Sequence, residues 1–275
     1  MGDMVIRGAR LHVEDTGEGE DDDAREVILF SHGLLWNTNL FSPQVAALKH
    51  RYRCIAWDHR GQGRSEVPVD GDEITIEEVT ADAIELIEQL DVAPCHFVGL
   101  SMGGFVGTRI AARRPELVRS LVLIDTTAEP EDPAKINRYR VLNLLARTIG
   151  VKAVLSRVAP IMAGATVLED PSLADRRKHI LDNLGANSRS IYKAVNGVVR
   201  REGNVDELAA ISCPVTILHG EEDAAISQQR SSCLVDGIPQ ATWMDVPKAG
   251  HSSTVENPDF VTAAITDHLD RVAAD

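Results

Sequence analysis

The sequence has few cysteines and no long apolar run, and each shortage argues against a class of protein. Four cysteines occur in 275 residues, at positions 54, 95, 213 and 233, and no two of them form a CxxC pair. This scatter favours buried free thiols over a disulfide framework. No segment approaches the roughly 18 consecutive apolar residues that a membrane-spanning helix needs. We therefore predict a protein with no membrane partner.

Positive charge is also in short supply. Lysine and arginine total 28 against 42 aspartates and glutamates, which gives a net charge of −14. Nucleic-acid binding requires a basic face, so this balance argues against a nucleic-acid partner. The first 20 residues contain no apolar core of a secretory signal, and Ile6 stands where a myristoylation motif needs Ser or Thr. These features predict a cytoplasmic protein.

The apolar residues that are present fall into short runs separated by amphipathic segments. Such runs are typical of strands that are buried on both faces of a mostly parallel sheet. The pattern therefore predicts an α/β fold with helices on both faces of the sheet. The candidate strands are residues 27–31, 53–58, 96–100, 120–125, 215–219 and 241–246.

Two segments depart from this rhythm. Residues 17–26 are acidic and contain glycine, which predicts a solvated turn between two N-terminal strands; a calcium loop would need a different ligand spacing. Residues 127–207 contain no convincing strand but several helical patterns. We therefore predict a core formed by residues 1–126 and 208–275, with a helical cap at 127–207.

A serine stands at a sharp corner in the segment HFVGLSMGG, residues 96–104. A strand ending at Leu100 and a helix starting near Met102 leave no room for an ordinary loop. The residues two before and two after Ser101 would nearly collide, which explains Gly99 and Gly103. This geometry is that of a nucleophile elbow, in which the serine oxygen projects clear of the sheet.

A nucleophilic serine needs a base, and the base needs a carboxylate that orients it. His251 lies in a glycine-led loop after the last candidate strand, where it would reach the carboxyl edge of the sheet. Asp223 follows strand 215–219, and the order Ser101, Asp223, His251 is that expected of this type of site. Asp125, at the end of strand 120–125, is a rival for the role of Asp223, and a one-residue difference in the loop would promote its neighbours Glu221 or Glu222.

The serine also needs donors for a developing oxyanion. Met102 N–H lies at a helix N-terminus, and the segment SHGLLWN, residues 31–37, would turn Leu34 N–H toward the serine. The preferred role for His32 is to brace this loop by hydrogen bonds. No cofactor or metal is expected, since Glu66 stands where a dinucleotide fingerprint beginning at Gly61 needs its third glycine.

Five motifs in this order resemble the α/β-hydrolase superfamily. They are HGLLWN, DHRGQGRS (58–65), GLSMGG (99–104), HGEEDAAI (219–226) and AGHSSTVENP (249–258). The segment 194–220 and GLSMGG are similar to 3-oxoadipate enol-lactonases and small carboxylesterases. Cofactor-free haloperoxidases share the triad, whereas haloalkane dehalogenases and epoxide hydrolases carry an aspartate where Ser101 stands. The resemblance implies a serine hydrolase of the α/β-hydrolase fold with a helical cap.

The sequence thus predicts a hydrolase that cleaves a small carboxylic ester or lactone through an acyl-enzyme. Other chemistry on the same triad, such as C–C bond hydrolysis or perhydrolysis, and a ligand-binding protein of this fold are the alternatives. Activity should fall below about pH 6–7, because the base must be neutral. Arg138 and Arg140 are candidates to bind a substrate carboxylate. The expected acyl pocket consists of Leu35, Trp36, Phe41, Tyr139, Leu142 and Met162, and packing in the hydrophobic core is the alternative role for these residues.

Overall fold

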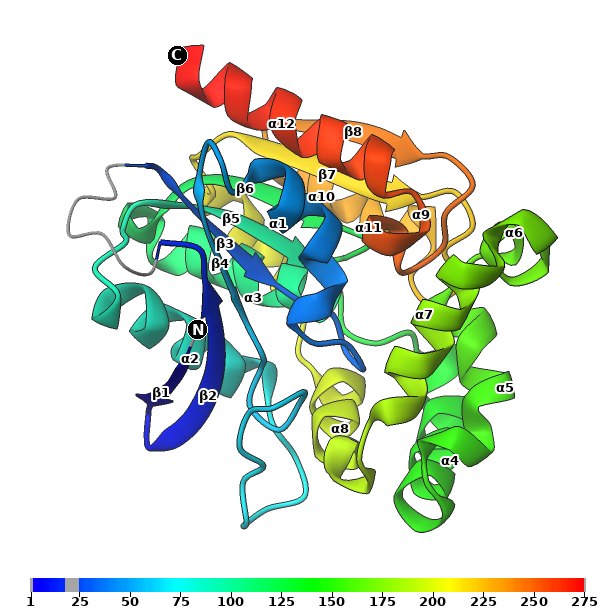
Figure 1. Ribbon diagram of the computed structural model, residues 1–275. Coiled ribbons are helices and arrows are strands. Elements are labelled where there is room, and N and C mark those ends of the chain that lie inside the picture. Colours follow the sequence, from blue (N-terminus) through cyan, green and yellow to red (C-terminus); the bar gives the residue numbers. More distant parts are fainter. Residues whose placement is uncertain (1, 18–24, 275) are drawn as a thin grey trace.

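The computed structural model describes residues 2–17 and 25–274, which form an eight-stranded sheet with helices on both faces (Figure 1). The predicted acidic turn at 17–26 falls mainly on residues 18–24, outside the described residues. The strand order is β1-β2-β4-β3-β5-β6-β7-β8. Pairs β1–β2 and β2–β4 are antiparallel and the other pairs are parallel. The strands are β1 (Gly2–Ile6), β2 (Ala9–Asp15), β3 (Val27–Ser31), β4 (Arg53–Trp57), β5 (Cys95–Leu100), β6 (Val118–Ile124), β7 (Val215–Gly220) and β8 (Ala241–Val246).

The predicted α/β fold class is confirmed, and each of the six predicted strands is present with ends that differ by at most two residues. The region before residue 17 forms two strands rather than one. A turn at Arg7 and Gly8, with φ of 47° and 76°, joins β1 to β2 as a hairpin. This hairpin has exposed positions in both strands, so its apolar residues are too sparse to form a continuous run.

Helices cover both faces of the sheet because successive strand residues point to opposite faces. Leu29, Leu121 and Leu123 pack in the cluster that includes α2 and α3, whereas Phe30 and Val122 pack in the cluster that includes α1 and α12. The α2 helix begins with a capping box between Thr75 and Glu78. The core helices are α1 (Ser42–Leu48), α2 (Ile76–Gln89), α3 (Met102–Arg113), α9 (Gln228–Ser231), α10 (Cys233–Gly237), α11 (Ser253–Glu256) and α12 (Pro258–Ala274), with 3-10 helices η1 (Thr38–Phe41), η2 (Pro115–Leu117) and η5 (Val205–Ala210).

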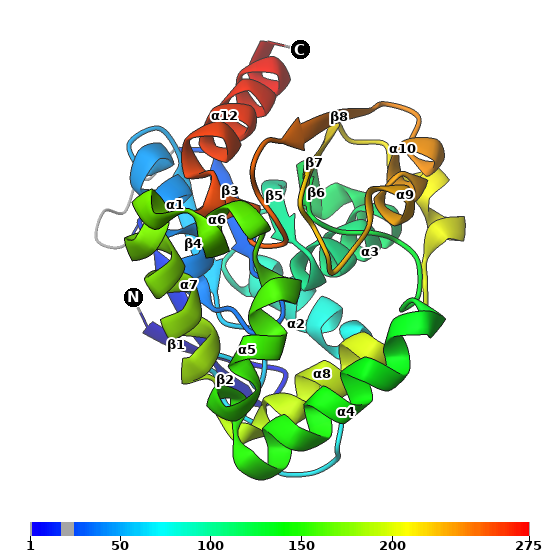
Figure 2. The same ribbon diagram turned by 90° about the vertical axis from the view of Figure 1, so that its right-hand side faces the viewer.

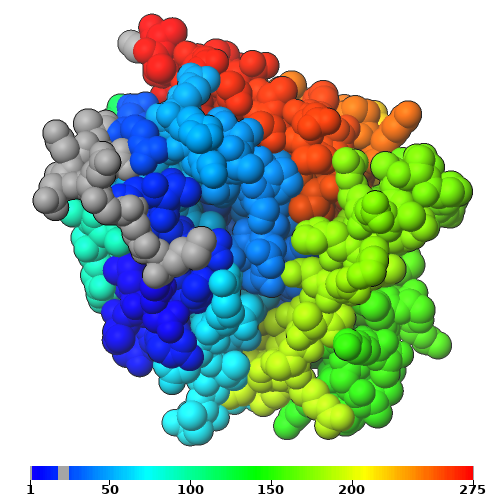
Figure 3. Space-filling model, viewed as in Figure 1, coloured from blue at the N-terminus to red at the C-terminus, as the bar shows by residue number. Residues whose placement is uncertain are grey.

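The segment between β6 and β7 is helical, and we call residues 127–207 the cap segment. Its helices gather on one side of the sheet in two perpendicular views (Figures 1 and 2). The space-filling view shows the cap segment packed against the blue and orange-red parts of the chain (Figure 3). It contains α4 (Pro133–Ile149), α5 (Val151–Met162), α6 (Ala165–Glu169), η3 (Pro171–Leu173), α7 (Ala174–Ala186), η4 (Arg189–Ile191) and α8 (Tyr192–Arg200).

Polar contacts fasten the cap segment to the rest of the chain. Asn183 and Asn187 each donate to the carbonyl oxygen of Leu35, at 3.2 and 2.8 Å. The buried Lys193 ammonium donates to three consecutive carbonyl oxygens in residues 68–70. Within the described residues, no helix combines the length and apolar character needed to cross a bilayer.

Candidate active site

Ser101 lies at the corner between β5 and α3, with φ 51° and ψ −111°. A positive φ is unfavourable for a residue with a side chain, so the surrounding structure must hold this conformation in place. Hydrogen bonds to the backbone groups of Ser101 contribute to this. Ser101 N–H donates to the Ile124 carbonyl at 2.8 Å, and the Thr126 hydroxyl donates to the Ser101 carbonyl at 2.8 Å.

The glycines beside Ser101 are required by close backbone approach. A Cβ atom on Gly99 would lie 2.4 Å from the Gly103 carbonyl oxygen, and one on Gly103 would lie 1.9 Å from the Ser31 carbonyl oxygen. Both contacts are with backbone, which cannot move aside as a side chain end can. The first matches the collision expected from the sequence. The second shows that α3 also approaches β3 closely at this point.

Ser101, His251 and Asp223 form one hydrogen-bonded chain, although Ser101 and His251 lie 150 positions apart in the sequence. The Nε2 atom of His251 lies 2.9 Å from Ser101 Oγ, and Nδ1 lies 2.8 Å from Asp223 Oδ2. Because a carboxylate only accepts, Nδ1 carries the proton and Nε2 is free to accept from the serine hydroxyl. Asp223 Oδ1 accepts from the N–H groups of Ala225 and Ile226, which fixes the carboxylate.

The environment of His251 raises its pKa above the ordinary value of 6.5. Burial by itself would lower the pKa, since it disfavours the charged imidazolium. The charge of Asp223 and its hydrogen bond oppose burial and outweigh it, with a smaller contribution from Asp125. The base is therefore stronger than an exposed histidine, and the imidazolium formed during catalysis would be stabilised.

Asp125 lies beside this chain but does not contact His251 through a hydrogen bond. Its two oxygens accept from Gly220 N–H at 2.7 Å and from Ser253 N–H at 3.2 Å. Burial, and then the nearby charge of Asp223, raise the pKa of Asp125 to about 7. Asp125 therefore ties the end of β7 to the start of α11, which are the segments next to Asp223 and His251.

The loop that carries Leu34 packs directly on the serine corner. A Cβ atom on Gly33 would lie 3.4 Å from Ser101 Cβ. Among the hydrogen bonds of residues 2–17 and 25–274, none uses the N–H of Leu34 or of Met102. His32 braces the loop, because its Nδ1 bonds to the Gly33 carbonyl at 2.7 Å and its Nε2 accepts from His59 N–H at 2.9 Å. The N–H groups of Leu34 and Met102 are thus available to an oxyanion.

Two buried side chains that support this site did not emerge from the sequence. Gln62 accepts from Leu35 N–H at 3.0 Å, and its amide group donates to Met102 Sδ at 3.4 Å. Glu256 accepts from Gly250 N–H, Ser252 N–H and Gly164 N–H at 2.8 to 3.0 Å. Both belong to motifs that were recognised, DHRGQGRS and AGHSSTVENP. Their contacts are with residues far away in sequence or with loop backbone, which no local pattern encodes.

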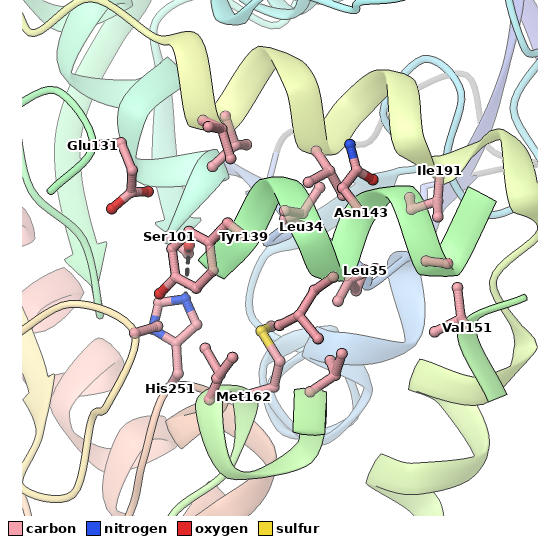
Figure 4. Close-up of a pocket in the computed structure, with 18 of the residues that line it drawn as sticks. Leu34, Leu35, Ser101, Glu131, Tyr139, Asn143, Val151, Met162, Ile191 and His251 are labelled. Atoms are coloured by element: carbon pink, nitrogen blue, oxygen red, sulfur yellow. Dashed lines mark hydrogen bonds between the residues drawn. The ribbon is translucent and has the colours of Figure 1, made fainter. Parts of the chain in front are cut away.

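A cavity lies between the cap segment and the serine corner (Figure 4). Leu35, Tyr139, Leu142 and Met162 line it, together with Ser101, His251 and Leu34. Most of the remaining lining side chains are aliphatic and come from the cap segment. They include Ala146, Val151, Val154, Val158, Ile161, Ile191, Val195, Val198 and Val199.

Two expected pocket residues do not line this cavity. Trp36 is fully buried in the core and donates its indole N–H to Ser252 Oγ at 3.1 Å. Phe41 is also fully buried, with its ring 5.0 Å from that of Phe30. Trp36 lies just before η1 and Phe41 is its last residue, and both side chains are buried in the core and not in the cavity wall. The expectation that they belong to the acyl pocket is wrong.

The arginine in the cavity is also not one of those expected. Arg138 and Arg140 are exposed on the outer surface of α4 and do not line the cavity. The arginine that does line it is Arg201, just after α8, which pairs with Glu131. The sequence offered no signal for this, because Arg201 follows another arginine in an ordinary helix end.

Hydrogen bonds account for the buried carboxylate oxygens of Asp125 and Asp223. Asp125, His219 and Asp223 offer ligand atoms that lie within 4.8 Å of one another. However, all four carboxylate oxygens of Asp125 and Asp223 already accept hydrogen bonds. The N–H groups of the surrounding loops and of His251 therefore satisfy these oxygens without an ion.

Comparison with known proteins agrees with this geometry. Residues 26–258 match the model of a family described as alpha/beta hydrolase fold. A protein of Pseudomonas syringae pv. syringae named "Putative carbamate hydrolase RutD" is 27% identical over 238 residues, which cover 86% of this chain and 90% of that protein. A 3-oxoadipate enol-lactonase 2 of Acinetobacter baylyi is 26% identical over 242 residues, covering 88% of this chain and 87% of that protein.

Solved structures give a similar result. The enol-lactonase from Burkholderia xenovorans LB400 superimposes with a TM-score of 0.88 at 28% identity, covering 98% of this chain and 99% of that one. A thermophilic esterase from Thermogutta terrifontis has a TM-score of 0.86 at 26% identity, covering 98% of each chain. The similarity therefore extends over the cap segment as well as the sheet.

Proposed function

The chain belongs to the α/β-hydrolase fold family and is a hydrolase of that fold, and from this premise we propose that it cleaves a small carboxylic ester or lactone through a covalent acyl-enzyme. The observation that carries the proposal is the chain of hydrogen bonds from Ser101 Oγ through His251 to Asp223, at 2.9 and 2.8 Å. It opens onto an apolar cavity, which suits an uncharged acyl group.

In the proposed reaction, Ser101 Oγ attacks the carbonyl carbon while its proton moves to His251 Nε2. The negative charge that develops on the carbonyl oxygen is held by the N–H groups of Leu34 and Met102. The tetrahedral intermediate then collapses, the bond to the alcohol oxygen breaks, and His251 returns the proton to that oxygen. A lactone would open in the same step, with its alcohol end still attached to the acyl group.

Deacylation repeats these steps with water as the nucleophile. His251 takes a proton from the water as the water oxygen attacks the carbonyl carbon of the acyl-enzyme. The proton returns to Ser101 Oγ when the acid leaves. Asp223 keeps the Nδ1 proton in place and stabilises the imidazolium in both halves of the reaction. Asp125, Gln62 and Glu256 act as positioning residues, because they hold the loops and not the reacting atoms.

Carbamate hydrolysis is a second candidate function. It is favoured by the relative named "Putative carbamate hydrolase RutD", which aligns with 86% of this chain. A carbamate presents the same carbonyl carbon to Ser101, so the same groups would serve. The leaving group would then be an amine or an alcohol, according to which bond to the carbonyl breaks.

The experiment is to measure turnover of p-nitrophenyl esters, small lactones and alkyl carbamates by the wild-type protein and by Ser101→Ala. We expect ester or lactone turnover in the wild type and a loss of at least about 10³-fold in the variant. A fluorophosphonate should label the wild type at Ser101 and leave the variant unlabelled. If the wild type turns over none of these substrates faster than the variant does, the proposed function is wrong; turnover of carbamates alone would favour the second candidate.

A further inference from the structure

The cavity beside Ser101 contains one pair of opposite charges in an otherwise apolar wall. Arg201 carries the only permanent positive charge among the described residues that line it, and Glu131 also lines it. Arg201 Nη1 lies 2.8 Å from Glu131 Oε2, with side-chain exposures of 2% and 10%. Figure 4 shows Glu131 near Tyr139 and Ser101, whereas Val151 and Ile191 lie toward the other end of the cavity.

The guanidinium of Arg201 is held by the protein through its Nε and Nη1 atoms. Besides Glu131, it donates to the carbonyl oxygens of Val198 at 2.8 Å and Glu129 at 3.2 Å. Its Cζ atom lies 4.3 Å from the ring centroid of Phe105, which is one turn of α3 after Ser101. Arg201 is thus held near the serine end of the cavity by contacts on several sides.

The carboxylate of Glu131 is held as well. Its Oε2 atom pairs with Arg201, and its Oε1 atom accepts from the N–H of Asp132 at 2.8 Å. A substrate carboxylate that approached Arg201 would either have to displace Glu131 or be repelled by the negative charge of Glu131 close to it. Asp223, which accepts from His251 Nδ1, adds to the negative field at this end.

From this arrangement we infer that Glu131 is a specificity-determining residue, which neutralises Arg201 and restricts the cavity to uncharged acyl groups. The inference rests on the proposed hydrolase function and adds the class of substrate to it. Adipate is a dicarboxylate, and forming a lactone uses one carboxyl group, so an enol-lactone of 3-oxoadipate retains one carboxylate. This chain should disfavour such a substrate relative to a neutral one of the same size, because the one permanently cationic side chain among the described residues that line the cavity is already paired with Glu131.

The experiment compares two esters that differ at the far end of the acyl chain. The p-nitrophenyl ester of hexanoate ends in a methyl group, and the mono-p-nitrophenyl ester of adipate ends in a carboxylate. At pH 8, with the Ser101→Ala rate subtracted, we expect the wild-type kcat/KM for the neutral ester to exceed that for the anionic ester by about tenfold or more. Equal efficiency for the two esters would overturn the inference while leaving the proposed function intact.

The variant Glu131→Gln keeps a hydrogen-bond acceptor for Arg201 but removes the negative charge. The ratio of anionic to neutral kcat/KM should rise by about tenfold. Glu129→Gln is the matched control, because the Glu129 side chain pairs with Arg230, 3.0 Å away, and does not line the cavity. Its ratio should equal that of the wild type.

An unchanged ratio in a folded Glu131→Gln variant would overturn the role of Glu131. If that variant fails to fold, the wild-type comparison still tests the preference, since it requires no substitution at position 131. A second measurement uses two alkyl fluorophosphonates, one ending in a methyl group and one in a carboxylate. Labelling of Ser101 in the wild type should be faster for the first, and equal rates would contradict the inference. If neither ester is turned over above the Ser101→Ala rate, the two labelling rates decide the inference, and the lactones and carbamates of the first experiment decide the proposed function.

Discussion

Replacing Asp223 with asparagine isolates the charge that orients and stabilises His251. The two side chains are joined by a 2.8 Å hydrogen bond, and the Asp223 side chain has no exposed surface. Asparagine keeps the size of the side chain and can keep the bonds that Ala225 and Ile226 donate. The substitution therefore removes a negative charge with little change in packing.

The expected loss follows from the geometry. Two unit charges about 4 Å apart attract by about 4 kcal/mol at an effective dielectric constant of 20, which corresponds to about 10³-fold in rate. An asparagine that turns its NH₂ group toward Nδ1 would also favour the wrong tautomer of the imidazole, and this loss reaches about 10⁴-fold in a serine protease with the same arrangement. We expect kcat for p-nitrophenyl butyrate to fall by about 10³- to 10⁴-fold.

The assay compares Asp223→Asn with Glu221→Gln and Asp125→Asn at pH 8. Glu221 is exposed on the same loop, and within the described part of the chain its carboxylate accepts only from Lys248 N–H, so its variant controls for the loss of one charge nearby. That control should retain kcat within about threefold. A loss of less than tenfold in Asp223→Asn, or a larger loss in Asp125→Asn, would show that Asp223 is not the carboxylate on which His251 depends.

Two further predictions concern the base and the corner. The kcat/KM of the wild type should fall at acid pH with a midpoint above 6.5, because Asp223 holds the pKa of His251 above its ordinary value and the base must be neutral; a midpoint at or below 6.5 in a steady-state pH profile would contradict this. Gly99→Ala should lower Tm by about 5 °C or more in a thermal melt, since its Cβ would lie 2.4 Å from the Gly103 carbonyl oxygen. Gly185→Ala in α7, where the nearest atom is 3.5 Å away, should leave Tm unchanged or raise it, and equal melts for the two variants would refute the steric argument.

Much of the fold could be read from local pattern. Five of the six predicted strands, β3 to β7, are continuous apolar runs because both faces of the sheet are covered, so each is visible without knowledge of its neighbours. The sixth, β8, lies at the edge of the sheet and is only partly buried. The β1–β2 hairpin was harder to see, because its residues alternate between buried and exposed positions and its turn at Arg7 and Gly8 is short. The serine corner could be predicted because a strained turn imposes glycines at fixed distances from Ser101.

The lining of the cavity could not be predicted in the same way. Trp36 and Phe41 are large apolar residues beside the loop that carries Leu34, and from sequence they suit a pocket as well as a core. The direction of Trp36 depends on Ser252, 216 positions later in the chain, and that of Phe41 on its packing against Phe30 in the neighbouring strand β3. The same holds for Arg201, whose partner Glu131 lies 70 residues earlier in the chain.

The sequence by itself determined the fold class, the serine at the corner and the order in which the candidate residues occur. Each of these depends on residues within a few positions of one another, where sterics and periodicity act directly. Only the tertiary structure decided that His251 meets Asp223 while Asp125 bridges the neighbouring loops, and that the cationic side chain lining the cavity is paired with Glu131. Those outcomes depend on distances between segments that the sheet brings together, because hydrogen bonds and ion pairs form only between groups that the folded chain places in contact.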